Sequence, residues 1–269
     1  MTPEGFRVTL FGLGEAGSLI AADLAKAGAQ VHGYDPAAVP TPTGIVRHGT
    51  PGPSVESSLM VLAVTAAVDA KNALEQSLSR IAPETIYADL STAPPSLKED
   101  LALTAVSEGL LFVDVALMGT VPGNGLATPS LASGPGAARY AAAINEAGGN
   151  VQVVGDSPGD AAARKLLRSV VTKGLTALLI EALEAAAVRG DADWLRHHLI
   201  ELITEADETV LDRFISGTSK HIDRRIVEME SARELVESLA VPAPMTTATV
   251  DMLRRIRSEG LPSNLDSQI

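Results

Sequence analysis

The chain contains no cysteine among its 269 residues, and aromatic residues make up only 3% of it. The absence of cysteine excludes disulfide frameworks, thiolate nucleophiles, cysteine-ligated zinc and iron–sulfur clusters, and it fits a reducing compartment. Positive charge is also scarce, because 21 Lys and Arg stand against 33 Asp and Glu, a formal net charge of −12. Such an acidic balance repels a phosphate backbone, so we expect no nucleic-acid partner.

Long uncharged apolar runs are missing as well. The best candidate, residues 174–188, is interrupted by Glu181 and Glu184, whereas a membrane span needs about 20 predominantly apolar residues. The first ten residues lack the basic segment and apolar segment of a signal peptide. We therefore expect a cytoplasmic protein with no membrane partner.

Hydrophobic residues, mostly Ala, Val and Leu, make up 46% of the chain. In the first half, apolar runs of strand length alternate with segments of helical periodicity. The expected strands cover residues 6–11, 30–34, 58–64, 85–90, 110–115, 130–133 and 150–154, and the expected helices cover 15–27, 66–81, 95–108 and 137–147. This alternation predicts βαβ units and a parallel sheet with helices on both faces.

The alternation of strand and helix patterns ends near residue 157. One long helical pattern runs over residues 160–188, and the sequence stays helical in character to about residue 257. We predict an α/β Rossmann-type N-terminal domain over residues 1–157 and an all-α C-terminal domain over residues 158–269 that begins with a long interdomain helix. The polar end of the chain, residues 261–269, is expected to fray.

A glycine-rich turn follows the first expected strand and opens the first helix. The candidate cofactor-binding residues there are Gly12, Leu13, Gly14, Glu15, Ala16 and Gly17, which form a G-x-G-x-x-G motif. The first glycine permits a tight turn, the second lets a pyrophosphate approach the backbone, and the third lets helix and strand pack closely. The helix N-terminus adds free N–H groups and a positive dipole end. We predict a dinucleotide site, with an ordinary strand–turn–helix as the alternative.

Asp35 ends the second expected strand. An acidic side chain there accepts hydrogen bonds from the adenosine ribose hydroxyls, which favours NAD over NADP. Its alternative role is to begin a turn with the following proline, and Arg47 is placed where it could still meet the 2′-phosphate of NADP. Val64 and Thr65 end the third apolar run, and we expect them along the cofactor because ligands bind at strand carboxyl ends. Simple strand termination is the alternative for both.

With these features placed, the chain resembles the β-hydroxyacid dehydrogenase family, which includes 3-hydroxyisobutyrate and 6-phosphogluconate dehydrogenases. Residues 89–92 (DLST) look like the family's D-x-S-T segment, and residues 112–120 (FVDVALMGT) look like a variant of its D-A-P-V-S-G-G segment. Residues 159–165 (GDAAARK) match G-x-G-x-x-x-K, with Ala161 in place of the second glycine. The resemblance covers nearly the whole chain. It implies an NAD(P)-dependent dehydrogenase of a hydroxy acid or carbonyl substrate, and a homodimer formed through the helical domain.

The same resemblance implies that Lys165 is the catalytic acid/base. The substrate-binding candidates are Ser91, Met118, Gly119, Thr120, Ser169 and Lys173. Two of these depart from the family pattern, since Met118 stands where the family has Ser and Ser169 where it has Asn. Residues 165–174 look like a less characterised branch that carries K-x-L-R-S-x-x-x-K-G.

Helical geometry independently puts Lys165, Ser169 and Lys173 on one face, because consecutive residues turn by about 100°. An amphipathic helix with a solvated lysine stripe is the alternative interpretation. A lysine serves as a general base when its pKa falls toward the working pH. Burial, or positive charge from Lys173 or Arg168, would lower it.

Two other functions stay open. An imine or ketone reductase could use the same fold, although imine reductases usually carry Asp or Tyr where Lys165 stands. A non-catalytic, dinucleotide-binding redox sensor is also compatible, because fold alone does not fix function. No metal site is expected: no paired-histidine spacing occurs, and Asp89 and Asp114, at strand ends, are interpreted as capping residues.

Overall fold

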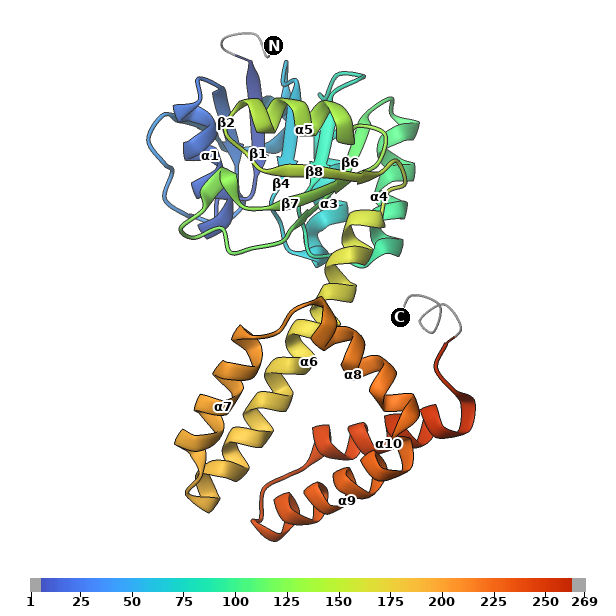
Figure 1. The fold of residues 1–269 in the computed structure, drawn as a ribbon. Helices are drawn as coiled ribbons and strands as arrows, with labels where there is room; N and C mark the ends of the chain where they lie inside the picture. The colour runs from blue at the N-terminus through green and yellow to red at the C-terminus, as the bar shows by residue number, and fades with distance from the viewer. Residues whose placement is uncertain (1–5, 263–269) are drawn as a thin grey trace. The chain divides into compact units, whose positions relative to one another are not determined.

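The computed structural model describes residues 6–262, so all but the first two residues of the segment predicted to fray, 261–269, lie outside the described residues. The described chain forms two compact units, one up to Arg168 and one from Ser169. The division falls inside the long helix α6 (Asp160–Arg189), which therefore contributes to both units (Figure 1).

The first unit is built on one eight-stranded sheet. Its strands are β1 (Arg7–Phe11), β2 (Gln30–Tyr34), β3 (Ile45–His48), β4 (Met60–Ala63), β5 (Ile86–Asp89), β6 (Leu111–Leu117), β7 (Ser130–Ser133) and β8 (Val151–Gly155). They lie in the order β3-β2-β1-β4-β5-β6-β7-β8. Neighbours are parallel except for β6 and β7, which are antiparallel. The order reverses between β1 and β4, and the crevice at such a switch point is where ligands bind in open α/β sheets.

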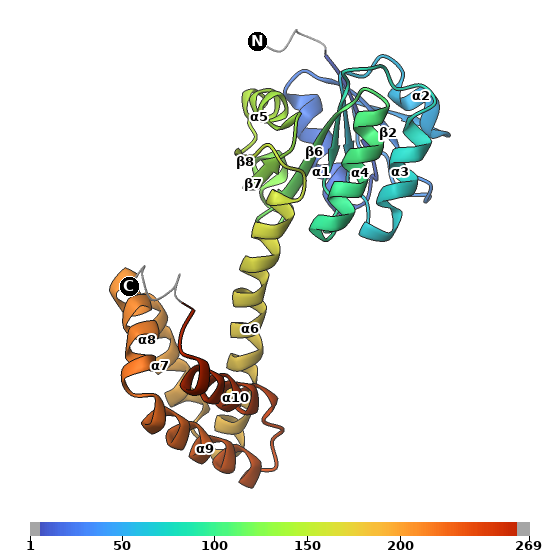
Figure 2. The same cartoon turned by 90° about the vertical axis from the view of Figure 1, so that its right-hand side faces the viewer.

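Helices cover both faces of this sheet (Figure 2). They are α1 (Glu15–Lys26), α2 (Pro51–Val55), α3 (Ala70–Ser77), α4 (Pro95–Ser107) and α5 (Ala137–Glu146), with short 3₁₀ turns η1 (Ala67–Asp69) and η2 (Gly125–Ala127). One core joins α1 and α5 to one face through side chains such as Leu24 and Tyr140. The other joins α2, α3 and α4 to the opposite face around Leu74 and Phe112. Burial on both faces explains why the central strands are continuously apolar rather than alternating.

The second unit is helical. After α6 come α7 (Ala192–Thr204), α8 (Glu208–Lys220), α9 (Ile222–Ser238) and α10 (Pro244–Glu259). A buried carboxylate links α6 to the start of α10: Glu181 accepts hydrogen bonds from the backbone N–H groups of Met245 (2.7 Å) and Thr246 (2.9 Å). Burial alone would raise the pKa of Glu181, but these bonds and one from the Thr246 hydroxyl outweigh it and lower that pKa. No helix within residues 6–262 is long and apolar enough to cross a membrane.

The predicted fold class, a Rossmann-type α/β region followed by an all-α region, is confirmed. Three local predictions were wrong. The chain forms a strand (β3) and a short helix (α2) between residues 45 and 55, where none was expected, because this edge strand is partly exposed and carries no continuous apolar run. The sheet is not wholly parallel, since β7 returns beside β6 without a crossover helix. The helix expected over 66–81 is a 3₁₀ turn followed by the shorter α3.

His32 and His48 face each other across β2 and β3, with His32 Nδ1 2.7 Å from His48 Nε2. Burial, and then the positive charges of Arg7 and His48, lower the pKa of His32 to about 4. An unfolded histidine has a pKa near 6.5. Between about pH 4 and pH 6.5, His32 is therefore protonated in the unfolded chain and neutral in the folded chain.

Because the unfolded chain takes up this proton, we expect the free energy of unfolding to fall as the pH drops from about 6.5 to 4. The fall is roughly 1 kcal/mol, since solvent screening reduces the effect of a partly exposed ring. Urea unfolding of the wild type and of His32→Asn across this range measures the difference. An identical pH dependence in the two proteins would show that His32 does not contribute.

Candidate functional site

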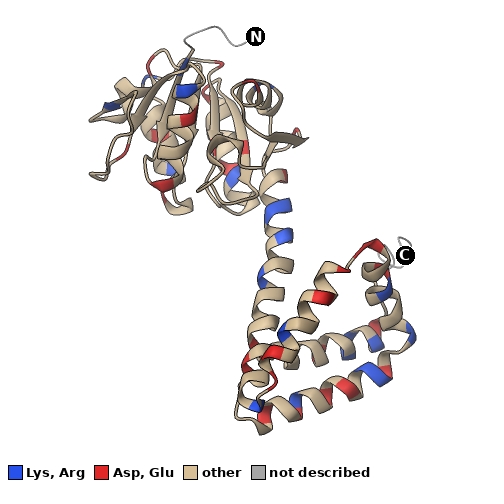
Figure 3. Cartoon of the chain, turned by 60° about the vertical axis from the view of Figure 1, so that its left-hand side comes forward, with Lys and Arg blue, Asp and Glu red and all other residues tan. Residues whose placement is uncertain are grey.

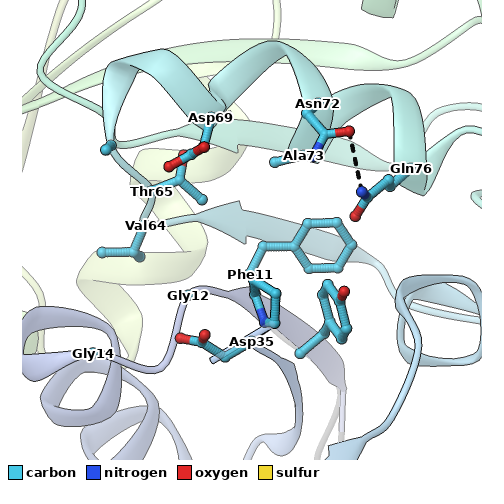
Figure 4. Close-up of a pocket in the computed structure, with 13 residues that line it drawn as sticks. Phe11, Gly12, Gly14, Asp35, Val64, Thr65, Asp69, Asn72, Ala73 and Gln76 are labelled. Atoms are coloured by element: carbon cyan, nitrogen blue, oxygen red, sulfur yellow. Dashed lines mark hydrogen bonds between the residues drawn. The ribbon is translucent and has the colours of Figure 1, made fainter. Parts of the chain in front are cut away.

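A cavity of about 300 Å³ lies at the carboxyl ends of β1, β2 and β4 (Figure 4). Its lining residues are Phe11, Gly12, Gly14, Tyr34, Asp35, Pro36, Val64, Thr65, Ala66, Asp69, Asn72, Ala73 and Gln76. Five of the predicted cofactor-binding residues, Gly12, Gly14, Asp35, Val64 and Thr65, thus meet in one place. The other four, Leu13, Glu15, Ala16 and Gly17, belong to the same turn and to the start of α1.

The three motif glycines are required for different physical reasons. Gly12 has φ +90°, and a Cβ added to it would lie 2.2 Å from the Val64 carbonyl oxygen. A Cβ on Gly17 would lie 2.0 Å from the Gly12 carbonyl oxygen, so helix and strand pack without room for a side chain. Gly14 is different, because nothing lies within 4 Å of the position of its Cβ. Space is therefore kept open beside Gly14, where a bound group can approach the backbone.

The start of α1 is free of side-chain caps. Its N-cap residue is Gly14, which has no side chain that could accept a hydrogen bond from the first turn. The first N–H groups of a helix have no partner inside the helix, and together with the helix dipole they attract an anion. The open space at Gly14 and these uncapped donors fit a pyrophosphate.

Asp35 takes the turn role that was the alternative interpretation, and its contact with the cofactor ribose stays a prediction. Its Oδ2 accepts the backbone N–H of Leu13 at 2.7 Å, which fixes the glycine turn, and its Oδ1 accepts the N–H of Ala37 at 2.8 Å, which begins a turn. The carboxylate still lines the cavity. Arg47 donates to the carbonyl oxygens of Val39, Asp35 and Ala37, so its guanidinium supports the loop that follows β2.

Thr65 offers an unused polar group to the cavity. Its Oγ1 is buried and has no hydrogen-bond partner among the described residues. A buried hydroxyl without a partner is costly in a folded protein, so a ligand group at this position would satisfy it. The orphaned hydroxyl is a second reason why this cavity fits a nucleotide cofactor.

Sequence reasoning missed the far side of the cavity. Phe11 and Tyr34 meet edge to face there, with ring centroids 5.7 Å apart, and Asn72 accepts a 3.1 Å hydrogen bond from the Gln76 amide on α3 (Figure 4). The i, i+4 spacing of Asn72 and Gln76 puts both on one helix face, but only the strand order shows that this face borders the switch point.

The predicted catalytic lysine contacts the D-x-S-T segment. Lys165 lies in the second turn of α6, and its Nζ donates to the Thr92 hydroxyl at 3.0 Å. The sequence prediction had chosen Ser91 rather than Thr92. Ser91 is buried and donates to Asp89 at 2.7 Å, while Thr92 is exposed. Both residues lie beyond Asp89, the last residue of β5, so no strand alternation in the sequence distinguishes Thr92 from Ser91.

Arg168, a second basic residue on α6, contacts the segment 112–120, which resembles the family's D-A-P-V-S-G-G segment. Arg168 donates to the Met118 carbonyl oxygen, and the Met118 N–H donates to the Pro129 carbonyl oxygen at 2.7 Å. Gly119 and Thr120 follow and are exposed. The structure therefore places Thr92 against Lys165, and Met118 against Arg168, which lies three residues further along α6. Ser169 and Lys173 belong to the second unit, and their place in the site stays a prediction.

Basic residues concentrate in the N-terminal half of α6 (Figure 3). Arg164, Lys165, Arg168 and Lys173 all lie there, although the whole chain has a formal net charge of −12. This cationic stretch begins where Lys165 and Arg168 meet the two strand-end segments. It supplies the local positive charge that an anionic ligand needs on an acidic protein.

The sheet order, the glycine turn and the cavity at the switch point define a dinucleotide-binding α/β domain. Comparison with known families agrees: the NAD binding domain of 6-phosphogluconate dehydrogenase matches residues 7–155. This match covers more than half of the chain, and the chain belongs to this family, whose fold is that of the β-hydroxyacid dehydrogenases. A domain of unknown function, DUF1932, matches residues 186–256.

Individual relatives are distant. A 3-hydroxyisobutyrate dehydrogenase of Pseudomonas aeruginosa is 29% identical over 197 residues, which is 68% of this chain and 65% of that protein. The matched segments span about two thirds of the curated relatives, 66% and 65% of their lengths.

Among solved structures, a conserved protein described as structurally similar to 3-hydroxyacid dehydrogenases is 26% identical, with a TM-score of 0.62 over 96% of this chain and 100% of that one. An imine reductase of Aspergillus terreus in complex with NADPH4 has a TM-score of 0.78 over 95% of each chain. At 19% identity, the latter likeness shows a shared fold alone.

Proposed function

We propose that the protein is an NAD(P)-dependent dehydrogenase that oxidises the hydroxyl group of a hydroxy acid, with Lys165 as general acid/base. The observation that carries the proposal is the contact of Lys165 Nζ with Thr92 Oγ1, which sets the lysine against the strand-end D-x-S-T segment. The family's nucleotide domain supplies the context, since residues 7–155 match it.

A bound nicotinamide would supply the hydride acceptor for such a reaction. The chain itself must remove the hydroxyl proton. Thr92 Oγ1 accepts one N–H of Lys165 and so directs the amine. Arg168 stands three residues further along the same helix, a spacing at which side chains are neighbours. Lys165 takes the proton in its neutral amine form. In the reverse direction, the same group returns the proton to the carbonyl oxygen.

The acidic group of the substrate needs positive charge or backbone N–H groups near Lys165 to bind it. We assign this role to the exposed backbone of Gly119 and Thr120, while Met118 makes the pocket more apolar. Ser169 and Lys173 stay substrate-binding candidates on the family resemblance. Ser91 is assigned to the floor of the site, beneath Thr92. The hydroxy-acid class rests on the lysine: an imine reductase would share the fold, but Lys165 supplies a base that alcohol oxidation requires.

NAD is the cofactor that we assign. Asp35 borders the cavity with a carboxylate that would repel a 2′-phosphate. Arg47, the cation that could have met this phosphate, is bound to three loop carbonyl groups instead. Both features support NAD over NADP.

We also propose the domain boundary at residues 157–158 and a homodimer formed through the helical domain. The boundary is supported by the gap between β8, which ends at Gly155, and α6, which begins at Asp160. The dimer is supported by large apolar side chains that are exposed in the second unit, such as Ile180 (61%), Trp194 (67%) and Phe214 (47%). Analytical ultracentrifugation tests it. A dimer is expected at micromolar concentration, and a monomer would contradict the proposal.

A substrate panel tests the proposed reaction. Reduced-cofactor formation is followed at alkaline pH with NAD and with NADP over 3-hydroxy acids, including branched and aryl members. We expect turnover of at least one hydroxy acid, with kcat/KM at least tenfold higher for NAD. Cyclic imine reduction with NADPH is assayed in parallel. Imine turnover without any hydroxy-acid turnover would favour the reductase, and tight cofactor binding without either would favour a sensor.

A further inference from the structure

A fully buried lysine lies beneath the candidate site. Lys98, in α4, has 0% of its surface exposed, and neither the proposed reaction nor the family match gives it a role. Its Nζ lies 2.7 Å from Asp89 Oδ2, 3.1 Å from Asp114 Oδ1 and 2.8 Å from the Asp89 carbonyl oxygen. The contact with the Asp89 carbonyl oxygen is a hydrogen bond, and the contacts with the two carboxylates are ion pairs.

The two carboxylates are side by side because of the sheet register. Asp89 and Asp114 are direct partners on the parallel strands β5 and β6, and both are completely buried. Two buried like charges at neighbouring positions repel each other, and Lys98 lies between them. Stability alone does not require such an arrangement, since apolar residues of similar volume often replace a buried ion pair without loss.

Asp114 connects this cluster to the beginning of α6. Its Oδ2 accepts the backbone N–H groups of Gly159 (3.2 Å) and Ala162 (2.9 Å). Ser133 donates to the same oxygen at 3.3 Å and accepts the N–H of Ala161 at 3.1 Å. The carboxylate therefore caps the helix turn that precedes Lys165, which confirms the capping role predicted for Asp114 and ties it to the catalytic helix.

Asp89 connects the cluster to the other half of the site. Its Oδ2 accepts the Ser91 hydroxyl at 2.7 Å, and Ser91 is followed by Thr92, the partner of Lys165. The contacts close a ring. It runs from Lys165 to Thr92, through Ser91 and Asp89 to Lys98, and through Asp114 and the first turn of α6 back to Lys165.

We propose that Lys98 is a positioning residue for the reaction: by binding the carboxylates of Asp89 and Asp114, it fixes the distance between the D-x-S-T segment and Lys165. The inference rests on the proposed function. Lys98 touches neither substrate nor cofactor in this role. It acts by holding the two segments between which the substrate hydroxyl would lie, and a misplacement of about 1 Å can cost a hundredfold in rate.

Two variants separate positioning from charge neutralisation. Lys98→Met removes the tether and leaves two buried carboxylates, so it is expected to lower stability. The double variant Lys98→Met/Asp89→Asn also removes the tether, but it restores the formal charge of the cluster to −1, the value that two aspartates and one lysine have in the wild type. Asp114 keeps its caps on α6 in both variants.

We expect the double variant to regain most of the Tm that the single variant loses and to bind NADH as the wild type does. Its kcat should stay at least tenfold below the wild-type value. Backbone amides of residues 159–162 should exchange with deuterium at least tenfold faster. A double variant with wild-type kcat and wild-type exchange would overturn the proposal, because charge balance would then be the whole role of Lys98.

A measurement on the wild type needs no variant. If the ring is one cooperative unit, the amide of Leu90, which follows Asp89 and donates to the Ala63 carbonyl oxygen at 2.8 Å, and the amides of residues 159–162 should show the same opening free energy in native-state hydrogen exchange. Independent opening of the two segments would contradict the proposal that the ring is one cooperative unit. Exchange does not depend on turnover, so a wild type that oxidises no hydroxy acid would contradict the proposed function, whereas uncoupled exchange would contradict the positioning role alone.

Discussion

Lys165→Ala is expected to lower kcat by about 10³-fold, because a positioned acid/base contributes roughly 10²–10⁴-fold to a proton-transfer step. NADH should bind to this variant with a Kd within twofold of the wild type, since the glycine turn and Asp35 are untouched. Steady-state assays with the best substrate of the panel measure kcat, and fluorescence titration measures the Kd.

Arg164→Ala is the matched control for this variant. Arg164 precedes Lys165 on α6 and is exposed, so its substitution removes the same charge from the same helix turn. It should keep kcat within about threefold of the wild type, since screening weakens the effect of an exposed charge. If Lys165→Ala retained more than a tenth of the wild-type kcat, Lys165 would not be the acid/base.

Gly14→Ala is expected to raise the Kd for NADH about 100-fold while leaving Tm within about 2 °C of the wild type. The added methyl group meets nothing within 4 Å in the protein. It would instead occupy the space by which a pyrophosphate approaches the backbone. A 100-fold loss of affinity corresponds to about 2.7 kcal/mol.

Two further glycine variants bracket this result. Gly49→Ala also meets nothing within 4 Å and lies away from the cavity, so both its Tm and its Kd should be close to those of the wild type. Gly17→Ala places a Cβ 2.0 Å from the Gly12 carbonyl oxygen, and overpacking of this kind costs about 1–3 kcal/mol of stability. Normal NADH affinity in Gly14→Ala would show that the cofactor does not pass this glycine.

The nucleotide half of the molecule could be predicted from sequence because its signals are local. The glycine motif, the strand before it and the helix after it are contiguous, and each glycine has a separate steric reason that the structure confirms at Gly12 and Gly17. Asp35 was found because it ends a recognisable strand. The edge strand β3 was missed because its partial exposure leaves no continuous apolar run to read.

The rest of the site depends on contacts between distant segments. Thr92 meets Lys165 across 73 positions of sequence, and only the fold shows that it, rather than Ser91, points toward the lysine. Lys98 was missed for a similar reason. A lysine in an amphipathic helix predicts a solvated position. The sequence around Lys98 does not indicate that two aspartates from adjacent strands contact its side chain.

The proposed reaction moves a hydride from the carbinol carbon of a hydroxy acid to the nicotinamide. Transfer of deuterium tests it most directly. The best hydroxy acid of the panel is deuterated at the carbinol carbon and incubated with wild-type enzyme and NAD, and the reduced cofactor is analysed by NMR. We predict that deuterium appears at C4 of the nicotinamide. Reduced cofactor that carries no deuterium, or no cofactor reduction with any hydroxy acid, would contradict the account.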